Sequence, residues 1–272
     1  MPEPMQVSCI QMCSSHDVEH NLAQATKYLK QAAENGSKLA LLPETFSFIA
    51  KNHEQKLENA EKEHLVLEFL SQQAKQYQLW IIAGSTLCPS EHGNKLYNRC
   101  PIFAPDGTQC ASYDKMHLFD VNLDTESWQE SQSIEAGQKP VSISINDDWK
   151  AGISICYDLR FPELYRYYSA SGCNILTVAA AFTVPTGKAH WEALLRARAI
   201  ENQCYVLASA QYGKHQDGRE TYGHSMIIDP WGKIISELPN GEGIITADLD
   251  LSYLQHVRAS LPALQHKSRD FR

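Results

Sequence analysis

The sequence lacks any apolar run that approaches the roughly 20 residues a membrane-spanning helix needs. Its first residues, Met1-Pro-Glu-Pro-Met5, have neither the basic flank and apolar core of a secretion signal nor the arginines of a mitochondrial transit peptide. We therefore expect no membrane partner and a cytoplasmic location.

A basic stripe is absent as well. The formal net charge is -8 at pH 7, from 24 Lys and Arg side chains against 32 Asp and Glu side chains. Because nucleic acid attracts proteins through clustered positive charge, this balance argues against a nucleic-acid partner.

No linker, internal repeat or low-complexity stretch divides the chain. A length of 272 residues is enough for a substantial core, in one large domain or two small ones. The absence of a dividing segment favours a single domain over residues 1–272.

Metal-binding cysteine spacing is also missing. Cys9 and Cys13 are four residues apart, but no matching Cys or His pair follows at the distances of a zinc finger. A disulfide framework is not expected in a chain this long without a secretion signal. We interpret the eight cysteines as reduced thiols, most of them in the core, which favours the cytosol; they are Cys9, Cys13, Cys88, Cys100, Cys110, Cys156, Cys173 and Cys204.

What the sequence does have is an alternation of strand and helix patterns. The expected strands cover 6–11, 38–42, 79–83, 98–103, 109–113, 141–145, 151–155, 174–178, 204–210, 224–228, 233–236 and 243–248. The expected helices cover 18–35, 59–77 and 189–202, and a further helix opens at Phe161. Turn signals predict three hairpins, at Pro105-Asp-Gly107, Asn146-Asp-Asp148 and Asp229-Pro-Trp-Gly232. Hairpins between βα units do not fit a plain parallel barrel, so we expect an α/β fold of two mixed sheets packed face to face with helices outside.

The segment Ala151-Gly-Ile-Ser-Ile-Cys-Tyr-Asp-Leu-Arg-Phe-Pro-Glu-Leu-Tyr165 predicts a buried strand that ends at Cys156. Pro162 can then occupy the first turn of a helix. A thiol at such a corner is open to a substrate above the sheet edge, and the N–H of Tyr157 can point at the same place. Alone, the segment leaves Cys156 open as either a nucleophile or a buried structural cysteine.

Two other segments end a strand in a charged residue. In Leu39-Ala-Leu-Leu-Pro-Glu-Thr-Phe46 the acid is Glu44, and in Ser112-Tyr-Asp-Lys-Met-His-Leu-Phe119 the cation is Lys115. An acid, a lysine and a cysteine that each lie just past a strand can meet at one end of a sheet.

This pattern resembles the nitrilase superfamily of carbon–nitrogen hydrolases, which has a Glu–Lys–Cys triad in that chain order. The resemblance runs from about Val7 to the end of the sequence and implies the family's four-layer α-β-β-α sandwich. It also implies that Cys156 is the nucleophile, Glu44 the general base and Lys115 the cation that stabilises the oxyanion. Many members carry a second glutamate that supports the triad, and Trp128-Gln-Glu-Ser131 places it at Glu130.

The chemistry expected of these residues needs neither a metal nor an organic cofactor. Glu44 removes the thiol proton, Cys156 attacks an amide or nitrile carbon, and water releases the acid from a thioester or thioimidate. Lys115 and the Tyr157 N–H hold the oxyanion.

For the neighbouring charged residues we expect structural roles rather than catalytic ones. We expect Asp158, Arg160 and Glu163 to brace the cysteine corner, and His117 to satisfy local backbone. His190-Trp191 is expected to open a helix and to act as packing or pocket wall.

The loop 179–191 follows a strand that corresponds to the Cys156 strand, so we expect it to line the pocket. Thr183, Thr186 and Lys188 can hold a substrate carboxylate, with Phe182 as a wall.

Within the superfamily, the segments Cys-Tyr-Asp-Leu-Arg-Phe-Pro-Glu and Ala-Arg-Ala-Ile-Glu-Asn-Gln-Cys-Tyr-Val look like the Nit branch. The segments 208–215 and 222–226 are similar to the member that cleaves deaminated glutathione into α-ketoglutarate and cysteinylglycine. The resemblance therefore implies a small-molecule amide substrate of this kind. Lys188 departs from the branch, which often has proline there.

Three rival classes stay open. An omega-amidase acts on small ω-amides such as α-ketoglutaramate. A papain-like protease needs a His–Asn pair and carries a Cys-Gly-Ser-Cys-Trp signature that this sequence lacks. A non-catalytic interaction protein has no need of Glu44, Lys115 and Cys156 together.

Assembly into a homodimer or a higher even oligomer is the last expectation. The helix after Cys156 carries Leu164, Tyr165, Tyr167 and Tyr168, more aromatic surface than one inward face requires. The polar segment 261–271 ends in Phe271 and is expected to lie across a neighbour. The resemblance implies pairing through this helix; the alternative is that these tyrosines pack within the monomer.

Overall fold

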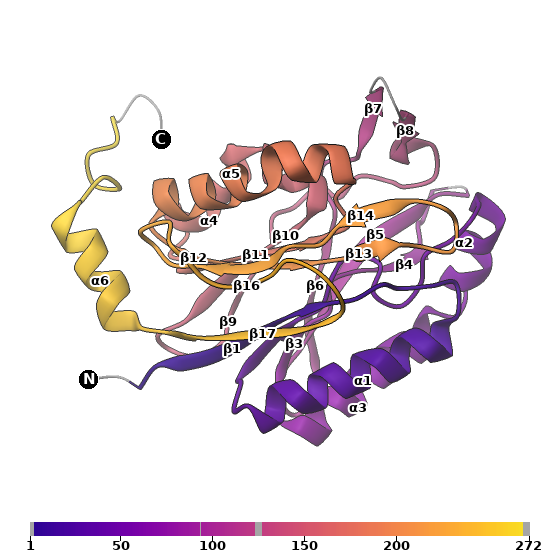
Figure 1. Cartoon of the computed structure of the whole chain (residues 1–272), viewed down its shortest axis with the longest axis horizontal. Helices are drawn as coiled ribbons and strands as arrows, with labels where there is room; N and C mark the ends of the chain where they lie inside the picture. The colour runs from indigo at the N-terminus through magenta and orange to yellow at the C-terminus, as the bar shows by residue number, and fades with distance from the viewer. Residues whose placement is uncertain (1–2, 93, 123–126, 269–272) are drawn as a thin grey trace.

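Most of the strands pair into two mixed β-sheets (Figure 1). The computed structural model describes residues 3–92, 94–122 and 127–268. In sheet order, the first sheet contains β17 (Gly243–Leu249), β1 (Met5–Gln11), β2 (Leu39–Leu41), β3 (Trp80–Ile82), β5 (Leu96–Phe103) and β4 (Thr86–Pro89), and β6 (Gln109–Asp114) pairs with β5. The second contains β16 (Ile234–Leu238), β15 (Ser225–Ile228), β12 (Tyr205–Ala210), β11 (Ile175–Ala180), β10 (Lys150–Ile155) and β9 (Ser142–Ser144). In the described residues two small antiparallel pairs are added, β7 (Asp120–Asn122) with β8 (Ser127–Gln129) and β13 (Tyr212–Lys214) with β14 (Glu220–Tyr222).

Helices cover the outer face of each sheet, which confirms the expected α-β-β-α sandwich (Figure 1). The first sheet is covered by α1 (Val18–Glu34) and α3 (Glu63–Tyr77), and the second by α4 (Pro162–Ala170) and α5 (Val184–Asn202). The short α2 (His53–Ala60) lies beside β4, and α6 (Leu251–Ser260) lies beyond the end of the sandwich near the N-terminus. None of the helices in the described parts of the chain has the length and apolar character to cross a bilayer.

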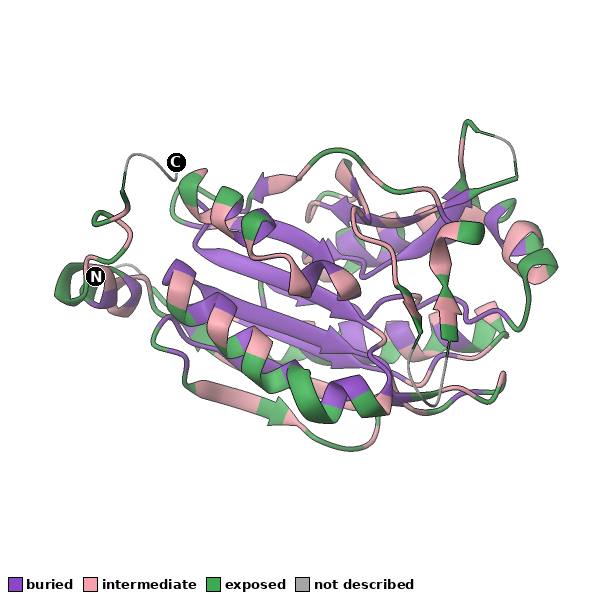
Figure 2. Ribbon diagram, turned by 90° about the horizontal axis from the view of Figure 1, so that it is seen from above, coloured by how far each residue is buried: buried purple, intermediate pink, exposed green. Residues whose placement is uncertain are grey.

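Strand periodicity explains how the first sheet serves two cores. Val7 and Cys9 of β1 face the core between the sheets, whereas Ile10 faces the core under α1 and α3. In β2, Leu41 and Ala40 divide between the two cores in the same way. Because successive side chains of a strand point to opposite faces, a sheet covered on both sides must be apolar at nearly every position. Figure 2 shows the result, buried strands beneath helices whose outer faces are exposed.

All three predicted hairpins are confirmed as antiparallel pairs. They join β5 to β6, β9 to β10 and β15 to β16. The strands β10, β11 and β12 run parallel to one another, as do β1, β2 and β3. The carboxyl ends of these parallel strands therefore meet at one end of the sandwich.

One helix that the sequence predicts is divided between two helices in the structure. The expected helix over 59–77 breaks at Glu61 and Lys62, between α2 and α3. The residues at the break favour helix, so the cause is tertiary: Ala60 packs with Leu87 and Leu96 in one small cluster, while α3 packs under the first sheet.

The helix predicted over 189–202 begins earlier, at Val184, so His190 and Trp191 lie inside α5 and do not open it. Pro185 lies in the first turn, where its missing N–H costs nothing. A Cβ on Gly187 would lie 2.3 Å from the ring of Tyr222, so the glycine permits close packing of α5 against β14. Its presence therefore does not indicate a loop.

The aromatic side chains of α4 are mostly internal, which corrects the expectation of an aromatic surface there. Leu164, Tyr165 and Tyr168 are buried, and only Tyr167 is exposed. The Tyr165 hydroxyl lies 2.7 Å from Ser154 Oγ, which fixes the helix to β10. Phe271 lies outside the described residues.

Candidate active site

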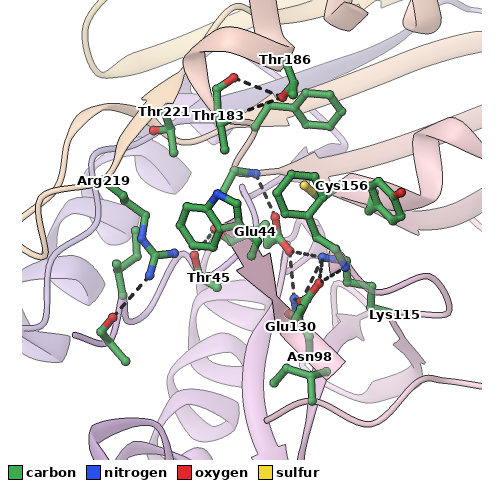
Figure 3. Close-up of a pocket in the computed structure, with 18 of the residues that line it drawn as sticks. Glu44, Thr45, Asn98, Lys115, Glu130, Cys156, Thr183, Thr186, Arg219 and Thr221 are labelled. Atoms are coloured by element: carbon green, nitrogen blue, oxygen red, sulfur yellow. Dashed lines mark hydrogen bonds and ion pairs between the residues drawn. The ribbon is translucent and has the colours of Figure 1, made fainter. Parts of the chain in front are cut away.

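Cys156 lies at the corner between β10 and α4, as the sequence predicts. Its φ of +50° is a left-handed conformation that is uncommon for residues other than glycine. The 3-10 turn η2 (Cys156–Arg160) begins at this residue, and α4 follows at Pro162. Asp158 accepts the N–H of Ile155 at 2.9 Å and so fixes the turn. The corner presents the thiol to a pocket, in which the residue is 7% exposed (Figure 3).

The buried carboxylate of Asp158 ties this corner to the segment that carries Lys115. Its Oδ2 accepts the Tyr113 hydroxyl at 2.6 Å, and its Oδ1 accepts the N–H of His117 at 3.0 Å. The bracing interpretation is therefore confirmed for Asp158. For the other two it stays a prediction: Arg160 lines the pocket, Glu163 is exposed, and neither forms an ion pair with another described residue.

Glu44 lies past the carboxyl end of β2 and is 5% exposed. Its Oε1 accepts from Lys115 Nζ at 3.0 Å and from Asn98 Nδ2 at 2.9 Å. Its Oε2 accepts the N–H of Ala181 at 2.9 Å. Because Ala181 directly follows β11, this bond joins the acid of the first sheet to the strand beside the cysteine strand. Three donors thus fix the orientation of the carboxylate.

Lys115 follows β6 and is 2% exposed. Its Nζ donates to Glu44 at 3.0 Å and to the two carboxylate oxygens of Glu130 at 3.0 and 2.9 Å. Burial by itself lowers the pKa of this ammonium, but the carboxylates of Glu130 and Glu44 outweigh it and hold the pKa well above its usual range. The side chain therefore stays charged at neutral pH.

Glu130 begins the 3-10 turn η1 (Glu130–Gln132), and its Oε2 also accepts the N–H of Phe119 at 2.7 Å. Asn98 of β5 donates to both acids, at 2.9 Å to Glu44 and at 3.4 Å to Glu130. Sequence reasoning missed Asn98, although a polar side chain inside an apolar strand was a signal for it.

The thiol of Cys156 is protonated at neutral pH. Burial raises its pKa, the carboxylate of Glu44 raises it further, and the ammonium of Lys115 lowers it by less, so the pKa lies well above the usual range. Nucleophilic attack by this sulfur therefore needs a base to take the proton.

A cavity of about 540 Å³ contains the three charged side chains and the thiol (Figure 3). Of the predicted substrate-binding residues, Tyr157, Phe182, Thr183 and Thr186 line this cavity. The hydroxyls of Thr183 and Thr186 lie 3.0 Å apart. The volume falls within the usual range for small-molecule sites.

Lys188 does not line the cavity, contrary to the expectation. It is exposed on α5. The prediction treated its segment as a loop, but the residue lies in the second turn of a helix that starts at Val184, and the helix directs it outward.

Three further cations line the cavity, namely Lys56, Arg160 and Arg219. Arg160 stacks over the rings of Tyr157 and Phe182, with its guanidinium carbon 5.7 and 5.5 Å from the ring centres. Lys56 belongs to α2 and Arg219 to the turn just before β14, and no motif in either segment distinguishes them from surface charges.

The site can carry out acid–base and nucleophilic chemistry on a carbonyl or nitrile carbon. Among the described residues that line the cavity there is no histidine, so the candidate base beside the thiol is a carboxylate. The described part of the chain also contains no group of three or more His, Cys, Asp or Glu side chains arranged to hold a metal ion.

A four-layer sandwich with a buried thiol, carboxylate and ammonium at one end defines the class as nitrilase-like. The solved structure of Nit3 from Saccharomyces cerevisiae, a member of branch 10 of the nitrilase superfamily, has a TM-score of 0.88 to this chain. It is 31% identical, with 99% of this chain and 97% of that chain covered. The chain belongs to the carbon-nitrogen hydrolase family, whose model matches residues 6–259.

Curated relatives carry two different activity names. Deaminated glutathione amidase of Synechocystis sp. is 43% identical over 269 residues, which cover 97% of this chain and 98% of the relative. Omega-amidase NIT2 of Xenopus tropicalis is 38% identical over 267 residues, which cover 97% of this chain and 95% of the relative.

Proposed function

We propose that this chain is a cysteine-dependent amidase that hydrolyses deaminated glutathione to α-ketoglutarate and cysteinylglycine, a metabolite-repair reaction. The observation that carries the proposal is the ammonium of Lys115, held between Glu44 and Glu130 in the cavity that contains the Cys156 thiol. The relative at 43% identity supports the choice of substrate.

In the acylation step, Glu44 takes the proton of the Cys156 thiol as the sulfur attacks the amide carbon. The oxyanion is held by the Tyr157 N–H and by Lys115, which exchanges one of its two contacts to Glu130 for the new oxygen. Glu44 then gives its proton to the amide nitrogen, the C–N bond breaks, and cysteinylglycine leaves with its amine.

In the second step, Glu44 takes a proton from water as the water oxygen attacks the thioester carbon. The C–S bond breaks, α-ketoglutarate leaves, and the proton returns to the Cys156 sulfur. Glu130 orients Lys115 and keeps it charged through both steps. Phe182, Thr183 and Thr186 contribute to the wall that receives the substrate.

An omega-amidase is the second candidate, supported by the relative at 38% identity that carries this name. Its substrate α-ketoglutaramate presents the same acyl group but releases ammonia. The test offers both amides to the purified enzyme and measures cysteinylglycine and ammonia. Faster release of cysteinylglycine, judged by kcat/KM, supports the main proposal, and a clear preference for α-ketoglutaramate would replace it.

We further propose a cytoplasmic homodimer. Support for the compartment comes from the eight cysteines, because all of them are free thiols and six are buried. Free thiols persist in reducing compartments.

A further inference from the structure

The cavity carries more positive charge than the proposed chemistry uses. Arg219 lies across the cavity from the group formed by Glu44, Lys115 and Cys156 (Figure 3). Its Nε pairs with Asp217 at 2.5 Å, which fixes the guanidinium. Nη2 makes one long contact, 3.4 Å to the Ala50 carbonyl, and Nη1 has no hydrogen-bond partner among the described residues. The outer edge of the guanidinium is thus free to bind a further acceptor.

Lys56 lines the same cavity without a carboxylate. Its Nζ donates to Ser133 Oγ at 2.9 Å, and within the described ranges it forms no ion pair. Burial lowers the pKa of this ammonium, and the positive charge of Arg219 lowers it further. Asp217 partly offsets the charge of Arg219, but Lys56 has no carboxylate bound to it, so an anion placed between the two cations would be stabilised by both.

Trp128 completes the arrangement. The guanidinium carbon of Arg219 lies 5.3 Å from the centre of its indole ring, which holds the charged group against the ring face. The indole Nε1 is buried and has no hydrogen-bond partner among the residues the structure describes. Because this N–H is shielded from solvent, the indole contributes its ring face to the arrangement and not its donor.

We propose that Arg219, Lys56 and Trp128 form a subsite for a carboxylate on the amine side of the scissile amide. The inference rests on the proposed function, because it assigns the far carboxylate of deaminated glutathione, that of its glycine. The nearby Glu220 also lines the cavity but is exposed, and it has no ion pair with Arg219.

The position of the subsite decides which end of the substrate it takes. Arg160, in the turn that begins at Cys156, places one cation beside the nucleophile, where the acyl part must lie. Arg219 lies across the cavity from the thiol and therefore meets the departing part (Figure 3). Small ω-amides that release ammonia have no group to place there. The subsite is thus a device that selects peptide-like amides over primary amides.

The test compares deaminated glutathione with its C-terminal carboxamide, which differs only in the far charge. For the wild-type enzyme we expect kcat/KM to favour the carboxylate by about 10–100-fold, mainly through KM, as charge-assisted hydrogen bonds of this kind require. Arg219→Gln and Lys56→Gln should each reduce this preference, and the double variant should bring it within about threefold. Lys214→Gln is the matched control, because it removes an exposed positive charge from the same small hairpin outside the cavity. It should keep the full preference.

The two proposals fail in different ways. Equal hydrolysis of both substrates by the wild type, or an Arg219→Gln enzyme that loses rate on both alike, would overturn the subsite and leave the proposed function intact. A wild type that hydrolyses neither substrate but releases ammonia from α-ketoglutaramate would overturn the proposed function, and the subsite with it.

Discussion

At the scale of single residues, the proposed reaction depends on the proton of Cys156. Burial keeps that proton on the sulfur at neutral pH, so in the proposed mechanism Glu44 takes it during attack. The ammonium of Lys115 meanwhile is kept charged by two carboxylates. In this proposal Glu44 transfers a proton and Lys115 does not. Separate substitutions of the two residues can test these different roles.

Lys115→Ala should lower kcat by about 10²–10³-fold, because it removes an oxyanion donor. It also leaves Glu44 and Glu130 facing each other without a cation, so the free energy of unfolding should fall. Steady-state kinetics and circular dichroism measure the two effects. Lys62→Gln, an exposed charge at the start of α3, is the control. Near-normal turnover of the Lys115 variant would mean that other groups hold the oxyanion.

The residues that sequence analysis found have local signals, and the missed Asn98 has one as well, but the missed cations Arg219 and Lys56 have none. Cys156, Glu44 and Lys115 each lie just past a strand, so their positions follow from the pattern. Arg219 and Lys56 lie in polar segments whose partners are set only by tertiary packing. No periodicity or spacing in the sequence predicts that these two side chains line the same cavity.

At the scale of elements, β10 and α4 act as one support for the cysteine corner. The Tyr168 hydroxyl donates to the Ile153 carbonyl at 2.5 Å, and its ring fills the space left by Gly152. Strand and helix were both predicted from the sequence. Their close contact was not predicted. The spacing of apolar residues shows which face of a helix points inward, but it does not show how near the helix lies to the sheet.

Gly152→Ala should test this support. The new Cβ would lie 2.4 Å from the ring of Tyr168, so we expect a loss of about 1–3 kcal/mol in the free energy of unfolding. The displaced strand end should also lower kcat. Urea unfolding and kinetics measure both. At Gly243, where a Cβ would lie 3.3 Å from the end of the Leu238 side chain, Gly243→Ala should change stability by less than about 0.5 kcal/mol. Equal effects of the two substitutions would contradict the packing argument.

Buried thiols such as that of Cys204, just before β12, should make the fold weaker at alkaline pH. Burial raises the pKa of Cys204 to about 12, against a lowering by Arg258, whereas an unfolded thiol titrates near about 8.5. Between these values the folded state binds more protons than the unfolded state, so the free energy of unfolding falls as pH rises. From pH 8 to pH 10, Cys204→Ala should lose about 1–2 kcal/mol less than the wild type. Denaturant unfolding at both pH values measures this loss, with Cys110→Ala, an exposed thiol, as the comparison. Parallel curves for wild type and Cys204→Ala would refute it.

At the scale of the whole molecule, the layers were predictable because hairpin turns and strand–helix alternation fix them. The outer surface was not predictable in this way. The sequence suggested four large apolar residues on the surface of α4, but three of them are buried in the monomer. What remains exposed on that side is Tyr167, at 53% of its surface. If the proposed dimer pairs through α4, Tyr167 is therefore the one of these four side chains that is exposed to contact a partner.

Sedimentation equilibrium at micromolar concentration should give a dimer, and Tyr167→Glu should weaken it and lower turnover, because α4 begins just after the turn that starts at Cys156. Trp231→Glu changes an equally exposed aromatic residue on the turn between β15 and β16, and it should leave the association state unchanged. A wild-type monomer with full activity would separate assembly from catalysis.

The most direct test of the central claim is the acyl-enzyme itself. Wild-type enzyme is mixed with deaminated glutathione, quenched in acid within milliseconds to seconds, digested and examined by mass spectrometry. We predict an α-ketoglutaryl thioester on the peptide that carries Cys156, none in Glu44→Gln, where no base takes the thiol proton, and no turnover by Cys156→Ala. An acyl group on another cysteine, or hydrolysis that persists without Cys156, would contradict the account.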